Sequence, residues 1–140
     1  RNYYFNLKLL GKNNENINIP LDLNVEYMGF IDPKKMYEQS HFFLLASFQE
    51  GYPKALAEAK SFGCVPITTL LTEGILKKSS KENNSFRIKS PEKKHILFAL
   101  KESAKKLDKW HKMSEDVYME ELKKQSYQKQ ICSIFKSYGK

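Results

Sequence analysis

The sequence has few cysteines, no repeat and no low-complexity segment, and these absences narrow the class of protein. Its two cysteines, Cys64 and Cys132, have no paired spacing and no histidine placed to complete a metal site. A disulfide scaffold and a zinc site are therefore not indicated. Each cysteine lies in an apolar pattern, so we predict two reduced, buried thiols.

Long hydrophobic runs are also missing. No apolar segment approaches the ~18 residues that a membrane-spanning helix needs, and the opening "RNYYFNLKLL" lacks the layout of a signal peptide. We therefore expect a cytoplasmic protein. Arg1 is not an initiator methionine and a strand pattern begins almost at once, so we expect the chain to be part of a longer protein that holds part of its site.

The composition that remains is that of one globular domain, residues 1–140. A chain of 140 residues with 41% hydrophobic and 13% aromatic residues can build a core and is too apolar for a disordered segment. The whole net charge of +8 lies in the second half, which can mark a nucleic-acid or membrane partner. However, lysines alternate with glutamates there, in "KESAKKLDKW" and "EELKKQ", and we favour a solvated helix face.

Strand and helix patterns alternate over the first 90 residues. Asp32-Pro33 and Pro53 each carry the signal of a helix start, and Gly63 that of a helix end. This alternation predicts an α/β fold, a Rossmann-like doubly wound parallel sheet of about five strands. The residues 12–24 show no helical periodicity, so either this crossover has no helix or the first strand is misplaced. The predicted strands cover residues 5–10, 25–30, 41–46, 64–69 and 85–89.

The remaining residues predict a C-terminal helical tail. Ser90-Pro91 begins a helix, Asp108 caps a second and Ser126 a third, so residues 108–140 hold the terminal helices. The apolar face of the first contains Ile96, Leu100, Ala104 and Leu107, that of the second Trp110, Met113 and Val117, and that of the third Tyr127, Ile131, Phe135 and Tyr138.

The segment "SFQEGYPKALAEAKSFGCVPITT", residues 47–69, places a turn between a predicted strand and a predicted helix. Open α/β folds bind ligands at this carboxyl edge of the sheet. Backbone amides of Gly51, Tyr52 and Lys54 lie at a helix N-terminus, where a phosphate is favoured. Glu50 and Glu58 can accept hydrogen bonds from hydroxyls on either side. A nucleotide sugar has this layout of hydroxyls about a phosphate.

The same residues carry a family resemblance. "EGYPKALAEA" resembles the E-x7-E signature of retaining glycosyltransferases of family 4, and "VEYMGFID" and "KKMYEQSHFFLLAS" follow the order of that family. The resemblance covers roughly residues 6–138 and is to the C-terminal, donor-binding half of a GT-B fold. It implies that the N-terminal acceptor domain and the first strand and helix of this domain lie outside the chain.

The resemblance implies a role for each matching residue. Glu50 would be the catalytic residue that orients the donor hexose and stabilises charge. Gly51, Tyr52 and Lys54 would lie near the hexose and diphosphate, and Glu58 would bind the ribose. The bound base would lie near Gly29, Phe30 and Ile31.

The resemblance also implies an overall activity. This is retaining hexosyl transfer from a nucleotide-diphosphate sugar, without metal or cofactor, to a sugar or lipid-linked acceptor, as in polysaccharide or glycoconjugate synthesis. Two departures weaken the match, since only Gly74 and Ile75 fit within "LLTEGILKK", and Lys12-Asn13 replaces an expected glycine. We expect this fragment alone to be inactive.

Other functions stay open at this point. A basic module could bind nucleic acid, although the sequence contains no recognition-helix or base-stacking motif. A regulatory domain of flavodoxin-like shape would need an acidic cluster at the strand ends, which the sequence lacks. Lys54 and Glu58 could form a plain surface pair. The loop lysines Lys77, Lys78 and Lys81 are expected to be solvated; their alternative is phosphate or an anionic lipid surface, which would place the protein peripherally at the inner face of a membrane.

Overall fold

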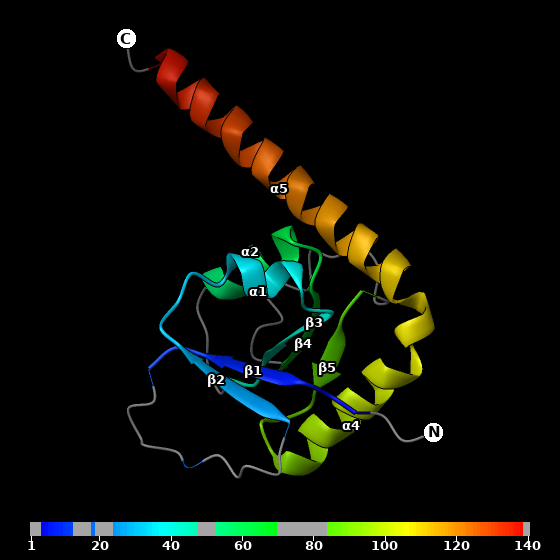
Figure 1. The fold of residues 1–140 in the computed structure, drawn as a ribbon. Coiled ribbons are helices and arrows are strands. Elements are labelled where there is room, and N and C mark those ends of the chain that lie inside the picture. Colours follow the sequence, from blue (N-terminus) through cyan, green and yellow to red (C-terminus); the bar gives the residue numbers. More distant parts are fainter. Residues whose placement is uncertain (1–3, 13–17, 19–23, 48–52, 70–83, 139–140) are drawn as a thin grey trace.

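The computed structural model describes residues 4–12, 18, 24–47, 53–69 and 84–138. Over these ranges strands alternate with helices and the chain then becomes wholly helical (Figure 1). The predicted α/β class and helical tail are confirmed. The elements are β1 (Leu7–Leu10), β2 (Val25–Gly29), α1 (Lys34–Glu38), β3 (Phe42–Leu45), α2 (Lys54–Ser61), β4 (Val65–Thr69), β5 (Phe86–Ile88), α4 (Lys93–Lys105), the 3₁₀ helix η2 (Leu107–Lys109) and α5 (Trp110–Tyr138).

The described strands form two sheets, where the sequence predicts one. β1 pairs with β2, and β3, β4 and β5 pair in that order; every pair is parallel, as predicted. Since β1 is paired with β2 in a parallel register that starts at Leu7 and Val25, the first strand was correctly placed. Most of the crossover that joins them, 13–17 and 19–23, lies outside the described residues.

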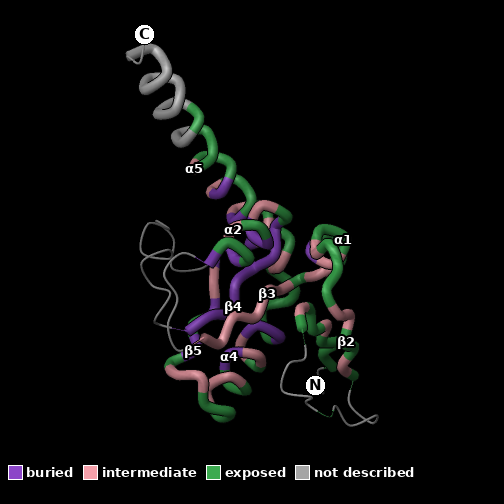
Figure 2. The backbone as a smooth tube through the Cα atoms, turned by 90° about the vertical axis from the view of Figure 1, so that its left-hand side faces the viewer, coloured by how far each residue is buried: buried purple, intermediate pink, exposed green. Residues whose placement is uncertain are grey.

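The three-stranded sheet holds the core, and β4 is its centre. Every residue of β4 is buried (Figure 2), as expected for a strand with neighbours on both sides and layers on both faces. Val65 and Ile67 pack on one face with residues of α4 and α5. Cys64, just before β4, packs on the other face with Tyr37 of α1 and Ala59 of α2. Each large apolar side chain so buried contributes about 1.5–3 kcal/mol.

Helix α2 starts and ends where the sequence predicts. Pro53 is its N-cap residue, and Gly63 follows the C-cap with a positive φ of 78°. The Gly63 N–H donates to the carbonyl of Lys60, and the Cys64 N–H to that of Ala59, both at 3.0 Å, which is the Schellman arrangement. A Cβ atom on Gly63 would lie 2.5 Å from Ser114 Oγ of α5, so glycine also lets α5 pack closely here.

Some helix boundaries differ from the predicted ones. α1 begins after Pro33, which is itself the N-cap, although the Asp32 carboxylate accepts a hydrogen bond from the Lys34 N–H at 3.1 Å. α4 begins at Lys93, after Pro91. The prediction that Leu107 belongs to the buried face of this helix was wrong, because Leu107 lies in η2 and is 46% exposed.

The two predicted tail helices are one. Asp108 lies within η2, and α5 continues through Ser126 to Tyr138, so the predicted break at Ser126 was wrong. Serine favours a helix start only where a competing turn is available, and residues 110–138 contain no glycine or proline to supply one. Met113 and Val117 are buried as predicted, whereas the side chains of residues 127, 128 and 130–138 are outside the description.

The predicted buried thiol at Cys64 is confirmed. It is free and fully buried, and its S–H lies 3.3 Å from the Tyr37 carbonyl oxygen and 3.5 Å from that of Ser40. Burial raises the pKa of the Cys64 thiol from its ordinary 9.0 to about 11. Cys132 lies in α5, where its side chain is not described.

We expect Cys64 to react at least ~100-fold more slowly with a thiol reagent at pH 8 in the folded protein than in urea, because two pKa units reduce the thiolate fraction by that factor. The measurement is the rate of alkylation in a Cys132→Ser variant, so that Cys64 is the reporter. Equal rates in the folded and unfolded states would contradict a buried thiol.

Candidate functional site

The candidate site lies where the strands end. Since every strand pair is parallel, the carboxyl ends of the strands within each sheet lie at a common edge. In one sheet the Tyr27 hydroxyl donates to the Gly11 carbonyl at 2.5 Å, and the Gly11 N–H to the Gly29 carbonyl at 2.9 Å. In the other, the Thr69 hydroxyl donates to the Ser47 carbonyl at 2.7 Å. These bonds fix the chain where it leaves each sheet.

At this edge, no side chain among the described residues caps the N-terminus of helix α2. Its N-cap, Pro53, provides no side-chain cap, and its first turn contains no acidic residue. The N–H groups of Leu56 and Ala57 donate to the Pro53 carbonyl. Within the described part of the chain, the N–H groups of Lys54 and Ala55 have no acceptor. Two orphan donors, the positive end of the helix and the exposed Lys54 side chain suit an anion.

Glu58 lies one turn further along α2 than Lys54 and is also exposed. The described residues include no ion pair between the two, so the plain surface pair is absent. Burial, and then the negative charge of Glu58, raise the pKa of the Tyr37 phenol in α1 above its ordinary 10.0. The Glu58 side chain is thus exposed, with no ion pair to Lys54.

The remaining predicted site residues divide into two groups. Gly29, Phe30 and Ile31 follow β2 directly; Gly29 takes a positive φ of 69°, and Phe30 and Ile31 are 86% and 42% exposed. They lie at the carboxyl end of β2, as predicted, with side chains accessible to a ligand. Glu50, Gly51 and Tyr52 lie outside the described residues, as do the loop lysines Lys77, Lys78 and Lys81.

The sequence predictions did not include the Thr69–Ser47 hydrogen bond. Thr68 and Thr69 are both buried at the end of β4, and the Thr69 hydroxyl holds the Ser47 carbonyl just after β3. The two threonines at the end of an apolar strand could have predicted such a bond, since a buried hydroxyl needs a hydrogen-bond partner.

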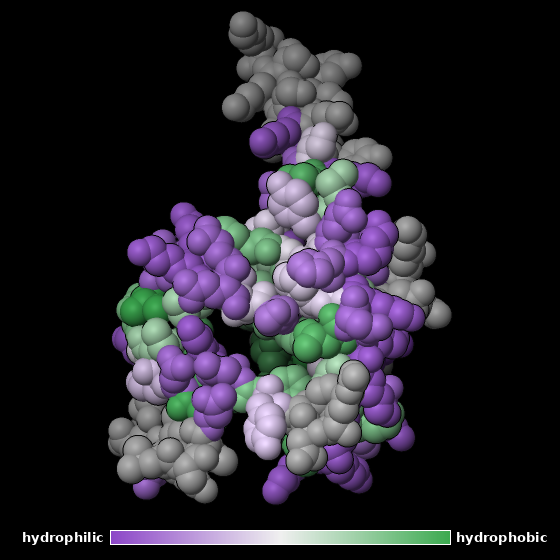
Figure 3. Space-filling view, turned by 45° about the vertical axis from the view of Figure 1, so that its right-hand side comes forward, coloured by the Kyte–Doolittle hydropathy of each residue, from purple (hydrophilic) through white to green (hydrophobic). Residues whose placement is uncertain are grey.

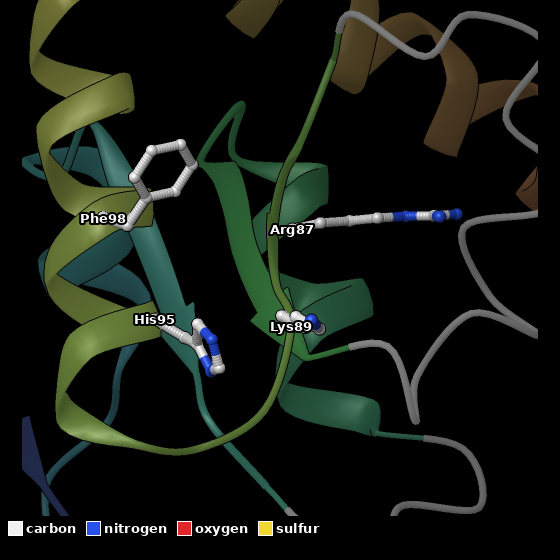
Figure 4. A pocket seen from close by; sticks show the side chains of 4 residues that line it. All are labelled: Arg87, Lys89, His95 and Phe98. Atoms are coloured by element: carbon white, nitrogen blue, oxygen red, sulfur yellow. The ribbon is translucent and has the colours of Figure 1, made fainter.

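One open pocket lies between β5 and α4. It has a volume of about 380 Å³ and is lined by Arg87, Lys89, His95 and Phe98. His95 and Phe98 project from α4, whereas Arg87 points to the opposite side of β5 (Figure 4). The His95 Nδ1 atom lies 2.7 Å from the Ser90 hydroxyl. Its walls are mainly apolar, and its cationic groups do not converge on one point.

Four lysines of the helical half are paired with carboxylates. Lys94 lies 3.0 Å from Glu92, and Lys112 lies 3.2 Å from both Glu115 and Asp116. Lys105 pairs with Glu102, and Lys124 with Glu120 and Glu121. These exposed pairs are typical of the solvated helix face that the sequence favours.

Two kinds of feature are absent from the described residues. They contain no cluster of three or more His, Cys, Asp or Glu side chains that could hold a metal ion. None of their helices is both long and apolar enough to cross a membrane.

The parallel α/β architecture with a C-terminal helix is that of a Rossmann-like domain. The family model for glycosyl transferases group 1 matches residues 2–107. Because this match covers most of the chain, the protein belongs to the group 1 glycosyltransferase family, which implies a transferase with a sugar donor and an acceptor. No curated protein and no solved structure matches the chain.

Proposed function

We propose that this chain is the donor-binding domain of a retaining, family 4-like glycosyltransferase of GT-B architecture, and that it binds a nucleotide-diphosphate sugar at the carboxyl edge. In this proposal α2 binds the diphosphate, Glu58 binds the ribose, and Gly29, Phe30 and Ile31 lie against the base. Glu50, with Gly51 and Tyr52, positions the transferred hexose.

The uncapped N-terminus of α2 is the observation that carries the proposal. The N–H groups of Lys54 and Ala55 have no acceptor among the described residues, and no acidic side chain of the first turn competes for the positive helix end. A diphosphate there gains two charge-assisted hydrogen bonds and the favourable helix dipole. Lys54 adds a positive side chain to the same turn.

Glu58 supports the ribose assignment. It is an exposed carboxylate, about one turn beyond Lys54, and its charge acts on Tyr37 of the neighbouring α1. α1 follows the Phe30–Ile31 segment with only Asp32 and Pro33 between them. A nucleotide with its phosphates on α2 can therefore extend across Glu58 towards the exposed end of β2.

The chemistry of transfer belongs to the proposal too. A retaining hexosyl transfer without metal or cofactor would require Glu50 to stabilise the positive charge that develops on the sugar. The acceptor, a sugar or a lipid-linked molecule, would be bound by a second domain, so the isolated chain would be inactive. We propose a cytoplasmic location, with peripheral contact at the inner membrane face where the acceptor is lipid-linked.

We expect the protein to bind one class of nucleotide sugar, and a Glu58→Ala variant to bind it at least ~10-fold more weakly, since a charged hydrogen bond contributes about 1.5–3 kcal/mol. The measurement is saturation-transfer NMR with UDP-, GDP-, ADP- and CMP-sugars, followed by titration with the ligand that responds.

Glu38→Ala is the matched control, because Glu38 is an exposed glutamate at the end of α1. Loss of transfer to the ribose protons in Glu58→Ala but not in Glu38→Ala is the expected result. Equal affinity in both variants would contradict the Glu58 assignment, and the absence of transfer from all four ligands to the full-length protein would contradict the donor class.

A further inference from the structure

The positive charge of the chain is concentrated in one described segment. Residues 87–109, which run from within β5 through α4 and η2, contain eight Lys or Arg and three Asp or Glu, a net charge of +5 out of the chain's +8. The next residues, 110–126 of α5, contain three Lys and four Asp or Glu, a net charge of −1. The excess charge therefore belongs to a particular surface and not to the helical half as a whole.

Helix α4 presents much of this charge to solvent. Its core-facing side holds Ala99, Ser103 and Ala104, which are buried. The opposite side carries exposed residues at i, i+3, i+4 and i+7 spacing, which share one face of a helix. With two exposed lysines that precede or begin the helix, they form what we call the α4 face: Lys89, Lys93, Lys94, Leu97, Phe98 and Lys101.

Carboxylates neutralise only part of the α4 face. Lys94 lies 3.0 Å from Glu92 in an exposed pair. Lys89, Lys93 and Lys101 form no ion pair within the described residues. Their ammonium groups can therefore contact an anionic surface while they stay hydrated.

Two large apolar side chains lie among these lysines. Leu97 and Phe98 are 45% and 63% exposed, and Phe98 also lines the open pocket with His95 and Lys89 (Figure 4). In the space-filling view, hydrophilic side chains cover the side of the molecule on which α4 and η2 lie, and hydrophobic ones are exposed between them (Figure 3). Phe and Leu side chains surrounded by lysines are typical of a surface that lies on anionic lipid.

The spread of the cations favours an extended surface over a single small ligand. Arg87 points to the opposite side of β5 from His95 (Figure 4), so these groups do not converge. A bilayer presents many separate anionic headgroups, and dispersed lysines can each contact one of them. A nucleic acid also presents dispersed phosphates, but it would leave Leu97 without an apolar environment.

We propose that the α4 face is the surface by which the protein lies on an anionic lipid bilayer. The inference rests on the peripheral location in the proposed function and assigns that contact to a surface. Lys89 directly follows β5, so it lies at the carboxyl edge of the three-stranded sheet, as does the N-terminus of α2. Contact through this face therefore brings the proposed donor-binding edge close to the bilayer, where a lipid-linked acceptor lies.

Sedimentation of the full-length protein with vesicles tests the surface. The vesicles contain about 30% phosphatidylserine in phosphatidylcholine. We expect a Lys93→Gln, Lys101→Gln variant to bind them at least ~10-fold more weakly, since each lysine near an anionic surface strengthens binding about fivefold. The matched control, Lys34→Gln, Lys35→Gln, removes two exposed lysines of α1, which packs on the other face of the sheet, and should bind as the wild type does.

The outcomes separate this inference from the proposed function. Vesicle binding that the Lys93→Gln, Lys101→Gln variant retains would contradict the α4 face alone. Failure of the wild-type protein to bind would contradict the peripheral location as well, and neither result bears on the donor, which the nucleotide-sugar titration tests. A variant that loses affinity for a DNA oligonucleotide, but not for the vesicles, would mark a nucleic-acid surface and overturn the proposal.

A fluorescence measurement tests whether the apolar side chains enter the bilayer. The full-length protein would carry Cys132→Ser and a fluorophore attached through Phe98→Cys, since Cys64 is buried. Doxyl-labelled lipid in the vesicles is expected to quench this fluorophore by ~2-fold or more, because side chains at such a contact reach the boundary of the headgroups and acyl chains. The control is the same label attached through Lys35→Cys, and equal quenching at the two positions would contradict the proposed orientation.

Discussion

Replacing Glu50 with alanine is expected to lower the kcat of the full-length enzyme by at least ~100-fold with little change in donor affinity. In the proposed mechanism Glu50 stabilises charge that develops on the hexose only as the glycosidic bond breaks. Removing one preorganised electrostatic contact of that kind costs about 10²–10³ in kcat. The measurement is steady-state kinetics with the donor found by NMR.

The pattern of kinetic change separates this role from a structural one. A contact made only in the transition state lowers kcat and kcat/KM together, whereas uniform binding would raise KM alone. Glu50→Gln is the conservative variant, since it retains a hydrogen-bond acceptor and removes the charge. Wild-type turnover in Glu50→Ala, measured beside a Glu38→Ala control, would exclude Glu50 from the catalytic site.

A buried ion pair between α2 and α5 should give the largest effect on stability. Lys60 and Glu121 have side chains only 2% and 6% exposed, and Lys60 Nζ lies 3.4 Å from Glu121 Oε2. The ammonium makes no shorter hydrogen bond within the described residues. We expect Glu121→Met to lower the free energy of unfolding by about 3–5 kcal/mol, because it leaves a buried charge without its anion. Urea denaturation measures this.

Two variants serve as controls. The Lys60→Met, Glu121→Met double variant removes both charges and should lie within about 1–2 kcal/mol of wild type, since apolar replacement of a whole buried pair is often tolerated. Glu115→Met breaks an exposed pair on the same helix, with Lys112, and should cost at most about 1 kcal/mol. A Glu121→Met variant no less stable than Glu115→Met would contradict the buried pair.

The pH dependence of this pair has a definite sign. Burial first, and then repulsion by Lys124, lower the pKa of the Lys60 ammonium below its ordinary 10.5. Between the lowered pKa and 10.5 the unfolded chain binds more protons than the folded chain, so Lys60 makes the free energy of unfolding rise with pH there. Burial of Cys64 acts oppositely above pH 9.0, and the Lys60→Met, Glu121→Met variant isolates the Lys60 contribution.

Much of the fold could be predicted because local signals agreed with the tertiary structure. Pro53 and Gly63 mark the ends of α2 through backbone geometry that few other residues adopt. The apolar run of β4 specifies a strand enclosed on both faces. The prediction of a helix start at Ser126 was wrong because a capping residue begins a helix only where the chain can turn. Here α5 continues through Ser126, and its earlier residues Met113 and Val117 pack in the core.

The split sheet and the Thr69–Ser47 bond could not be predicted because both depend on segments distant in sequence. Among the described residues β1 pairs only with β2 and β3 only with β4, and the apolar residues of β1 and β3 would suit an edge or an interior position equally. The candidate site was predictable in part. Lys54 begins α2, Glu58 lies within it and Gly29 ends β2, as the local patterns predicted, whereas the ligand roles of these residues and of Glu50 stay predictions.

The two ends of helix α2 lie against different parts of the molecule. It has eight residues and is thus about 12 Å long, too short to bend without breaking hydrogen bonds. Lys54 begins it at the sheet edge, and Lys60, near its other end, is joined to α5, whose far part extends beyond the body of the domain (Figure 1). A shift of α5 relative to the sheet would therefore be passed through the Lys60–Glu121 pair to the N-terminal turn of α2, the turn that we propose to bind the diphosphate.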